Sequence, residues 1–351
     1  MKFTISTARL NAILSRVAKG LGNNKIMPIT QYLKVTLENG ILSVTATDSN
    51  NFITCRSTGF EGDSGTAIVR GETLIKLSAK TTSEKVKIEL KQDHLEFKGN
   101  GKYKIELFET NEFPCYSFDT SVEKTEIEVS KLKKMFAVNS SAIANEMLVP
   151  YLTGFNAGLM CITTDGIKMC VTATALFSSP VLISQPLSEL INCLPTEKVF
   201  AQRQDNKILF TTESIVIFGT ELDGIEDYPD VKPVLGIEYK NHVVVNKKQL
   251  VDTLDRMSLL VTEFDNYGVK LSFEEKCIVL TDLKNNGREE VEYVDTEQSG
   301  KEAVVVSIKH LAELLSKLTS PIVTMFYGAE LPLKIREDKV VQILGRMEEN
   351  E

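Results

Sequence analysis

The sequence predicts an α+β protein made of three tandem copies of one domain, each with two helices beside an antiparallel sheet. A short apolar strand ends in Thr-Asp three times, at Asp48, Asp165 and Asp282, with equal intervals of 117 residues. The chain of 351 residues is three such intervals long. Helical and strand patterns also keep the same order around each Thr-Asp. Equal spacing and constant order together indicate an internal repeat.

Each copy opens with a strand followed by a helix. The strand FTIS leads to a helical pattern with Ser6 as its cap, IEVS to one with Ser130, and VVVN to one with Asn246. Ser and Asn side chains accept hydrogen bonds from the free N–H groups at a helix start. After each Thr-Asp comes a second short helix, and the next strand follows SEKV, TEKV or SPIV. The predicted helical segments are 6–20, 72–80, 130–146, 187–194, 246–262 and 307–318.

The segments between the helices are typical of hairpins. Asn39-Gly40 and Asn100-Gly101 each separate two strand-like segments, and Asn-Gly is a favoured two-residue hairpin turn. Stretches that contain Pro and have weak periodicity lie near positions 121 and 241. The expected domains are 1–121, 122–241 and 242–351.

Composition excludes several classes of protein. Apolar residues make up 42% of the chain and charged residues 25%, as in a globular protein. No apolar run is long enough for a signal peptide or for the ~20 residues of a membrane span, so we expect a cytoplasmic protein without a membrane partner. The six cysteines form no C-x-x-C pair, and the three histidines lack metal-ligand spacing. We therefore expect reduced thiols, no metal and no cofactor.

An enzymatic interpretation would use Asp48, Asp165 and Asp282 as a carboxylate cluster for metal-assisted hydrolysis. Their equal spacing, however, places them in three separate domains, too far apart to share a metal ion. An Asp that closes a turn by accepting hydrogen bonds from the backbone explains all three. The sequence therefore predicts a protein that is not an enzyme.

The distribution of charge matters more than its sum. The net charge of −8 argues against a nucleic-acid partner if charge is spread evenly. The predicted helices, however, contain 13 basic and 6 acidic residues, against 27 basic and 42 acidic in the rest of the chain. Basic helices can hold duplex DNA loosely through its phosphates, although each cation alone is as well explained by a solvated helix face. The helical candidates for DNA binding are Arg9, Arg16, Lys19, Lys76, Lys80, Lys131, Lys133, Lys134, Lys247, Lys248 and Arg256.

Short motifs with a shared resemblance run in order along the whole chain. They are the opening MKFTIS, Leu21-Gly22, Met27-Pro28-Ile29, Ala46-Thr47-Asp48, Glu112-Phe113-Pro114, Tyr151-Leu152-x-Gly154, Thr164-Asp165-Gly166, Asp227-Tyr228 and Gly268-Val269. Together they resemble the β subunit of bacterial DNA polymerase III, the β sliding clamp family. The resemblance implies the DNA clamp fold, with two chains closing head to tail as a homodimer into a six-domain ring around duplex DNA.

The resemblance also implies a function without chemistry. A sliding clamp is a processivity factor that tethers the replicative DNA polymerase, and a clamp loader places it on DNA without regard to sequence. Tethering raises the effective concentration of the polymerase at its template. The alternative is a clamp-like module that never encircles DNA and acts as a decoy by occupying clamp partners.

Partner proteins of this family insert a short peptide into a cleft between the second and third domains. The matching positions are Leu152, Thr164, Gly166, Ile167, Lys168, Met169, Val231, Val341, Ile343, Leu344, Gly345, Arg346 and Met347. Simple core packing explains Leu152, Met169 and Ile343 equally well, because apolar side chains fill both cores and grooves.

Ring closure in the family joins the first domain of one chain to the third domain of the other. The matching positions are Lys76, Lys80 and Tyr103 on one side, and Leu260, Val261, Glu289, Glu290 and Glu292 on the other. The three glutamates also fit an exposed strand edge that resists aggregation. In addition, the resemblance implies that Asn24 and Lys25 contact DNA.

Three departures from the family pattern concern the cleft. Ile167-Lys168 stands where His-Arg is usual, Pro229-Asp230 replaces a basic pair, and ILGRM is followed by the acidic tail 348–351. These changes predict a different preference for the partner peptide, as in a diverged or mobile-element copy.

Overall fold

The structure is a computed structural model of the chain. It describes residues 1–23, 26–108, 113–145, 149–195, 197–297 and 301–348. Two compact units are present, one formed by Met1–Lys133 with Ile183–Glu221 and the other by Lys134–Leu182 with Leu222–Glu351. We call them unit 1 and unit 2. Their division runs through the predicted middle copy, and the domain boundaries near 121 and 241 stay predictions.

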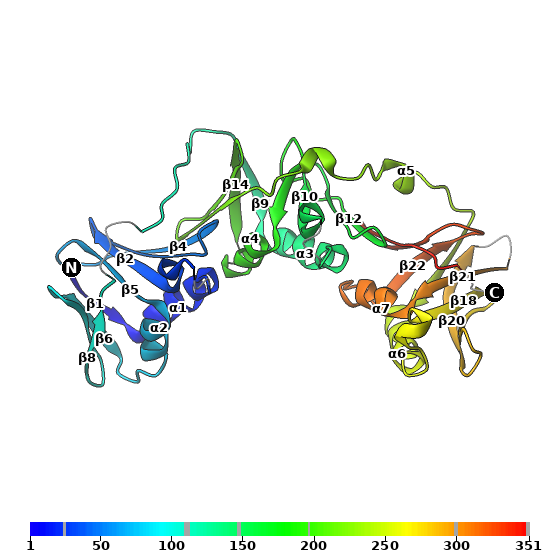
Figure 1. Ribbon diagram of the computed structural model, residues 1–351, viewed down its shortest axis with the longest axis horizontal. Helices are drawn as coiled ribbons and strands as arrows, with labels where there is room; N and C mark the ends of the chain where they lie inside the picture. Colours follow the sequence, from blue (N-terminus) through cyan, green and yellow to red (C-terminus); the bar gives the residue numbers. More distant parts are fainter. Residues whose placement is uncertain (24–25, 109–112, 146–148, 196, 298–300, 349–351) are drawn as a thin grey trace. The chain divides into compact units, whose positions relative to one another are not determined.

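Each third of the described chain contains eight strands, as the predicted repeat requires (Figure 1). The first third contains β1 (Lys2–Ser6), α1 (Thr7–Val17), η1 (Ala18–Gly20), η2 (Pro28–Gln31), β2 (Tyr32–Glu38), β3 (Ile41–Thr47), β4 (Asn51–Thr58), β5 (Gly65–Arg70), α2 (Gly71–Ala79), β6 (Lys85–Leu90), β7 (His94–Lys98) and β8 (Lys102–Glu106). The second contains β9 (Lys124–Glu128), α3 (Val129–Asn139), η3 (Ser140–Ala142), η4 (Pro150–Thr153), β10 (Gly154–Ala157), β11 (Cys161–Thr164), β12 (Lys168–Thr172), β13 (Val181–Ser184), α4 (Gln185–Leu190), η5 (Ile191–Cys193), β14 (Lys198–Gln204), β15 (Lys207–Thr211), β16 (Ile215–Thr220), η6 (Ile225–Asp227) and α5 (Lys232–Leu235). The third contains β17 (Asn241–Asn246), α6 (Lys247–Met257), η7 (Glu263–Asp265), β18 (Gly268–Phe273), β19 (Cys277–Asp282), β20 (Arg288–Glu297), β21 (Glu302–Ser307), α7 (Ile308–Ser316), β22 (Ile322–Tyr327), β23 (Leu333–Glu337) and β24 (Val340–Leu344).

Antiparallel strand pairing joins successive copies of the repeat. Unit 1 contains a four-stranded sheet, β1-β6-β7-β8, and an eight-stranded sheet, β5-β2-β3-β4-β16-β15-β14-β9. The twelve-stranded sheet is β13-β10-β11-β12-β24-β23-β22-β17-β20-β19-β18-β21, and it lies in unit 2 except for the end of β13. In both units the fourth strand of one copy pairs with the eighth strand of the next, β4 with β16 and β12 with β24. We call these two pairings the seams.

Helix starts follow the predicted caps in two of three copies. The Ser6 side chain accepts a hydrogen bond from Arg9 N at 3.3 Å, and that of Asn246 accepts one from Gln249 N at 3.0 Å. The prediction for Ser130 is wrong, because α3 begins at Val129. The buried Val129 donates its backbone N–H to Glu197 O at 2.9 Å, as the first helix residues Thr7 and Lys247 donate to Glu84 O and Pro321 O. Glu128, and not Ser130, therefore has the position that Ser6 and Asn246 have in the other copies.

The two Asn-Gly turns differ. Asn39 and Gly40 have φ of 51° and 73°, which confirms the predicted two-residue turn between β2 and β3. The prediction of a two-residue turn at Asn100-Gly101 is wrong. Lys98 pairs with Lys102, so three residues form the loop between β7 and β8. Asn100 instead accepts hydrogen bonds at its Oδ1 from the backbone N–H groups that precede β6, at 2.7 and 3.3 Å.

The Thr-Asp landmarks are turn closures, as predicted. Asp48 Oδ1 accepts hydrogen bonds from the N–H groups two and three residues later, at 2.9 and 2.7 Å. Asp165 Oδ1 repeats this pattern with the same two distances. Asp282 closes a longer turn, in which its carboxylate accepts from Gly287 N at 2.7 Å and Lys284 N at 3.1 Å.

Replacing Asp282 with Ala is expected to lower the free energy of unfolding by about 2–3 kcal/mol, because the turn loses its acceptors at a buried position. Urea titration of the purified protein measures this change. The Asp282→Asn variant keeps one acceptor oxygen and should lose much less. Equal losses in both variants would contradict the role given to the carboxylate.

Helices cover one face of each main sheet. In unit 2, side chains of α6 and α7 form a single buried cluster with the strands, in which the rings of Phe273 and Tyr327 stack at 3.7 Å between centroids. In unit 1, the opposite face at the seam carries a smaller cluster around Phe52 and Phe218, covered by Tyr116. No helix in the described ranges is long and apolar enough to cross a membrane.

Candidate functional site

An apolar surface lies on the face of the unit 2 sheet opposite α6 and α7, at the seam between β12 and β24. Strand alternation places Met169 and Val171 of β12 on this face, with Ile343 of β24 directly opposite Met169. We call it the unit 2 seam surface. Its residues are Ile162, Met169, Val171, Val231, Leu235, Val341 and Ile343.

The chain that follows β16 forms one border of this surface. Tyr228 Oη donates a hydrogen bond to Ile162 O at 3.2 Å, and burial raises the pKa of Tyr228 well above its usual range. The ring of Tyr228 also meets Tyr151 edge to face, with 6.5 Å between centroids. Gly224 has φ of 92°, and a Cβ there would come within 3.0 Å of the Tyr151 ring. These contacts hold the segment that carries Val231 against the sheet.

The structure brings together four predicted cleft residues, Met169, Val231, Val341 and Ile343. Sequence reasoning missed Ile162, Val171 and Leu235. The alternation along β11 and β12 is a signal for the first two, whereas no local pattern marks Leu235. The roles of all these residues in binding stay predictions.

Other predicted cleft residues surround the seam without joining the apolar cluster. Thr164 Oγ1 donates to Lys168 O at 2.8 Å within the β11–β12 turn, where Gly166 has φ of 89°. Ile167 is 54% exposed and accepts a hydrogen bond from Gly345 N at 2.8 Å. The remaining three are Leu152, half-buried in η4, Arg346, which is exposed, and Met347, which donates its N–H to Val305 O at 2.8 Å.

Two cleft predictions are wrong as to side-chain direction. Lys168 is only 4% exposed and points to the helix-covered face, where its Nζ lies 2.5 Å from Glu313 Oε2 and 3.5 Å from Asp165 Oδ2. Leu344 also belongs to the core beneath α7. The reason is the two-residue period of a strand, which places neighbours of Met169 and Ile343 on the opposite face.

Only some of the predicted DNA-binding cations are free. Lys19, Lys80 and Lys248 are exposed, and within the described ranges their side chains have no hydrogen bond or ion pair. Arg16 is half-buried, with no bond from its guanidinium within the same ranges. Asn24 and Lys25 lie outside the described residues.

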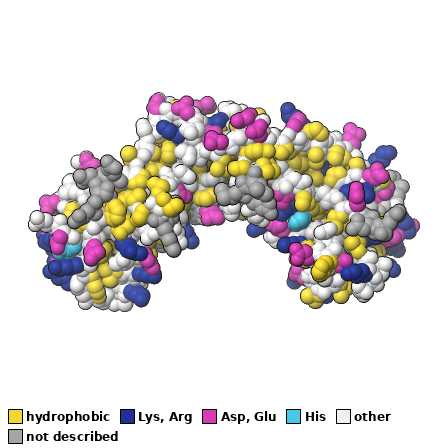
Figure 2. All heavy atoms as spheres, in the orientation of Figure 1, with side chains coloured by type: hydrophobic (Ala, Val, Ile, Leu, Met, Phe, Trp, Pro, Cys, Tyr) yellow, Lys and Arg dark blue, Asp and Glu magenta, His cyan; other side chains and the backbone are white. Residues whose placement is uncertain are grey.

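The other predicted cations have partners within the chain. Ion pairs join Lys76 to Glu72, Lys131 to Glu128, Lys134 to Glu337 and Arg256 to Glu289, while Lys133 and Lys247 donate to the carbonyls of Leu194 and Leu318. Such contacts support the interpretation of these residues as part of the helix surface. In Figure 2 Lys and Arg side chains gather at the end of unit 1 that carries β6, β8 and α2.

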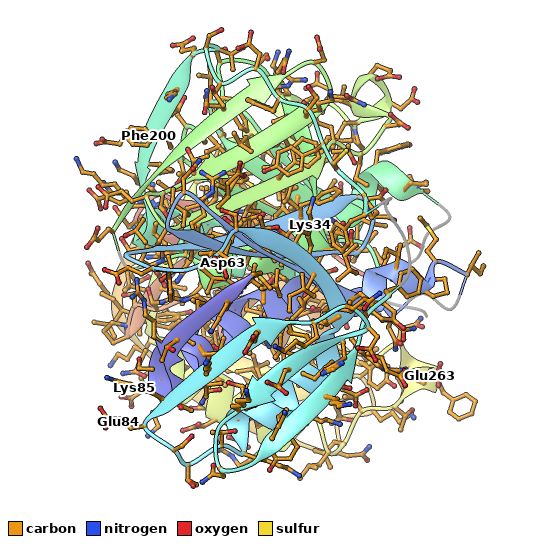
Figure 3. All side chains as sticks on the ribbon, turned by 90° about the vertical axis from the view of Figure 1, so that its left-hand side faces the viewer. Lys34, Asp63, Glu84, Lys85, Phe200 and Glu263 are labelled. Atoms are coloured by element: carbon orange, nitrogen blue, oxygen red, sulfur yellow. The ribbon has the colours of Figure 1, made fainter. Side chains whose placement is uncertain are left out.

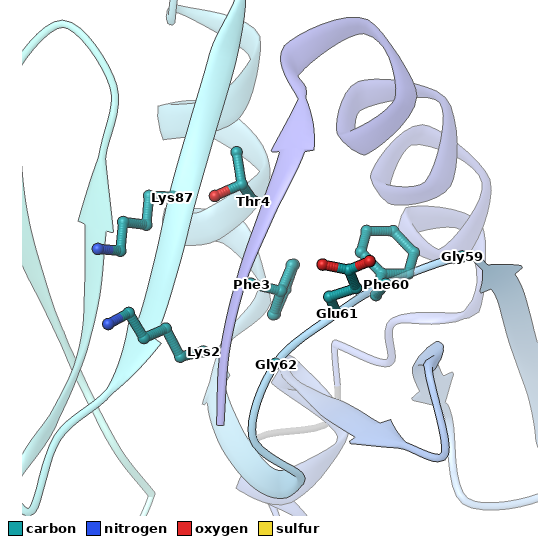
Figure 4. Close-up of a pocket in the computed structure, with 8 residues that line it drawn as sticks. All are labelled: Lys2, Phe3, Thr4, Gly59, Phe60, Glu61, Gly62 and Lys87. Atoms are coloured by element: carbon teal, nitrogen blue, oxygen red, sulfur yellow. The ribbon is translucent and has the colours of Figure 1, made fainter.

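Arg9 has a structural partner of another kind. It donates to Thr58 O at 2.8 Å, and its guanidinium lies 5.0 Å from the centroid of the Phe60 ring. Phe60 forms one wall of a recess of about 510 Å³ (Figure 4). Lys2 of β1 and Lys87 of β6 also line this recess, and in Figure 4 both side chains project to the side of β1 away from the Phe60 ring.

The predicted dimer residues lie on the strands β8 and β20, on α2 and its C-cap, and in the turn after α6, and one assignment needs correction. Tyr103 is 42% exposed on β8, the edge strand of its sheet. Leu260 is 40% exposed, but Val261 belongs to the unit 2 core, so its assignment to the interface is wrong. It follows the last turns of α6 and packs inward beside Met257.

The glutamates of β20 lie on an unpaired edge. Glu289 pairs with Arg256 inside unit 2, where this contact lowers the pKa of Glu289, while Glu290 and Glu292 are exposed. Residues 288–292 pair with β19 alone, and β17 pairs only with the later part of β20. Both interpretations of these glutamates, as an interface and as a protected edge, are compatible with this arrangement.

Metal and thiol chemistry finds no support in the described ranges. No group of three or more His, Cys, Asp or Glu side chains there is arranged to hold a metal ion. Burial raises the pKa of Cys55 and of Cys170 to about 12, which keeps these thiols protonated and unreactive.

Comparison with protein families matches both ends of the chain. Residues 1–117 match the family described as DNA polymerase III beta subunit, N-terminal domain. Residues 232–344 match the C-terminal domain of the same subunit.

Similar proteins span the whole chain. The beta sliding clamp of Bacillus subtilis is 27% identical, and the alignment covers 98% of each chain. That of Buchnera aphidicola from Rhopalosiphum padi is 26% identical over 93% of each chain. The solved DNA polymerase sliding clamp of Bacillus subtilis has a TM-score of 0.90 at 23% identity and covers 99% of both chains. The DNA polymerase III subunit beta of Pseudomonas aeruginosa also has a TM-score of 0.90, at 20% identity, and covers 99% of this chain and all of that one. These structures share the fold of the present chain.

Proposed function

Because the chain belongs to the DNA polymerase III beta subunit family, we propose that it is a DNA sliding clamp that tethers the replicative polymerase to duplex DNA. The match of its two ends to the N- and C-terminal domains of that subunit carries this proposal. The clamp makes and breaks no covalent bond. It acts in the cytoplasm by keeping the polymerase near its template, where effective concentration replaces affinity.

Two chains form the ring in this proposal, each with three domains. The unpaired edges of β8 and of residues 288–292 support it, because such edges offer free N–H and C=O groups to another chain. Exposed Tyr103 and Leu260 supply apolar area for the contact, flanked by the Lys80 and Glu290 charges. A solution mass of about twice 39.1 kDa is the expected result at micromolar concentration.

The ring proposal is tested by the topology of the DNA. Protein loaded on circular plasmid by its clamp loader should stay bound through gel filtration, and cutting the plasmid once should release it. Retention on both circular and linear plasmid would mean that the protein binds DNA by affinity alone. Retention on neither would favour the decoy. A variant that has lost dimerisation is the matched control.

The free helical cations are expected to contact phosphates. Changing Lys19, Lys80 and Lys248 together to Gln should reduce the salt dependence of DNA binding by a slope of about 3, since each phosphate contact contributes about 0.9. Binding of duplex DNA at several salt concentrations measures the slope. Unit 1 and unit 2 should both keep their melting temperatures, because the three side chains are exposed.

A control triple variant changes Lys240, Lys276 and Lys339, exposed cations outside the helices, to Gln. Its slope should stay within experimental error of the parent value. An equal fall in both triple variants would show that DNA contacts are not concentrated on the helices.

The unit 2 seam surface is the proposed site for partner peptides of the polymerase and of the clamp loader. Its apolar residues, bordered by the exposed Ile167 and Arg346, support this assignment. A peptide with apolar side chains would remove them from water on binding, which is the main favourable contribution for such a groove.

A further inference from the structure

A groove with a different chemistry lies beside the seam of unit 1. The groove has a volume of about 260 Å³ and lies on the face of β2, β3 and β4 that the helices leave open, beside the segment 113–116. In unit 2 the corresponding face carries apolar side chains. Here the floor is made of hydroxyl groups.

Strand register arranges the floor in two rows. One row crosses the sheet from Lys34 through Thr45 to Thr54, and the next crosses it from Thr36 through Ser43 to Arg56. Lys34 and Arg56 therefore stand at diagonal corners, and the strand spacing and rise place their Cα atoms ~12 Å apart. Figure 3 shows Lys34 over the strands of this sheet.

The hydroxyl groups keep donors for a ligand. Thr45 Oγ1 and Thr54 Oγ1 lie 2.9 Å apart and share one hydrogen bond, which uses one of their two hydrogens. Ser43 has no side-chain hydrogen bond within the described ranges. An acceptor lying across the floor can therefore receive hydrogen bonds from both rows.

The groove is cationic, and the described residues of its lining include no acidic side chain. Among the described residues neither Lys34 nor Arg56 has a carboxylate partner, and the Lys34 ammonium lies 5.9 Å from the centroid of Phe113. Two unpaired cations in a protein of net charge −8 favour an anionic ligand.

The aromatic wall argues against single-stranded nucleic acid. The Tyr116 ring stacks on Phe218 at 4.1 Å and meets Phe52 edge to face at 5.2 Å, and Phe113 is buried. One face of Tyr116 is therefore covered by Phe218, whereas single-stranded binding sites present open aromatic rings to the bases. Two cations are also few for a phosphate backbone.

We propose that this groove binds an extended acidic segment of a partner protein, with carboxylates at positions i and i+4. Side chains four residues apart lie on the same face of an extended chain and ~13 Å apart, which is close to the diagonal between the two cations. Lys34 and Arg56 each hold one carboxylate, and the hydroxyl floor donates to the peptide carbonyls between them. This inference goes beyond the sliding-clamp function and does not depend on it.

Cys115 supplies the measurement, because it is exposed and lines the groove. The half-buried Cys193 and Cys277 are first changed to Ser, and maleimide labelling of Cys115 is followed over time. The probe is a capped heptapeptide of Ser with Asp at its second and sixth positions, and the control peptide has Asn there. We expect the acidic peptide alone to slow labelling.

Variants of Lys34 and Arg56 then test whether these two cations are responsible for the protection of Cys115 by the peptide. Lys34→Gln and Arg56→Gln should each raise the half-protecting peptide concentration about fivefold, the upper range for an exposed ion pair. Lys104→Gln, an exposed cation outside the groove, should leave it unchanged. Unchanged melting temperatures show that each variant is folded.

Three results would overturn the inference. They are equal protection by both peptides, no protection by either, and protection that persists in the Lys34→Gln, Arg56→Gln double variant. Protection by oligothymidylate alone would identify a nucleic-acid groove and also overturn it. The assay uses no DNA loading, so each result leaves the proposed sliding function to its own test.

Discussion

Replacing Val341 with Asp is expected to weaken binding of the polymerase subunit by at least about 100-fold, which corresponds to about 2.7 kcal/mol. Val341 is half-buried at the unit 2 seam surface, so a carboxylate there stays hydrated in the free protein. A bound apolar peptide would remove that water, and an unpaired charge loses several kcal/mol when it is buried. The substitution therefore destabilises the complex with the peptide and not the folded protein.

The matched control is Val234→Asp. Val234 is exposed on α5, in the segment that borders the seam surface, but it does not belong to the apolar cluster. This variant should bind within about twofold of the parent, because its carboxylate stays in water. Surface plasmon resonance with the immobilised polymerase subunit measures both affinities. Equal weakening by both variants would mean that charge alone, and not the seam surface, governs binding.

Lys168→Glu is expected to lower the free energy of unfolding by about 4 kcal/mol or more. Lys168 is buried and lies between the carboxylates of Asp165 and Glu313. A glutamate at this position would place three carboxylates together, and the buried one would have to take up a proton or force the contact apart. Urea unfolding measures the loss.

Lys168→Met separates the charge from the packing. Methionine keeps most of the side-chain volume, and Glu313 remains partly exposed to water, so the change in stability should stay within about 1 kcal/mol. Burial lowers the pKa of His310, and the positive charge of Lys168 lowers it further. NMR titration should therefore find a higher His310 pKa in the Met variant. A large loss of stability in both variants would contradict the electrostatic argument.

Periodic features of the sequence predicted most of the fold. The recurrent Thr-Asp at Asp48, Asp165 and Asp282 and the capping residues Ser6 and Asn246 are local, and local hydrogen bonds hold them in the structure. The capping prediction at Ser130 was one residue inside the helix, which begins at Val129.

Site residues were less predictable, because resemblance identifies positions but not directions. Met169 and Lys168 are neighbours in the sequence, yet the pleat of β12 places one on the seam surface and the other under α7. Among the cations, only the fold shows that Arg256 is already paired with Glu289 while Lys248 remains free. Partners distant in the chain decide these outcomes.

By itself, the sequence determined the α+β class, the threefold repeat and its order of elements, because hydrophobic period, caps and turns act over a few residues. Only the tertiary structure decided that β4 pairs with β16 and β12 with β24, and that hydroxyl groups and two cations line the sheet beside the unit 1 seam. Pairing between distant strands chooses which side chains share a face. That choice made an apolar surface in unit 2 and a cationic groove in unit 1 from copies of one domain.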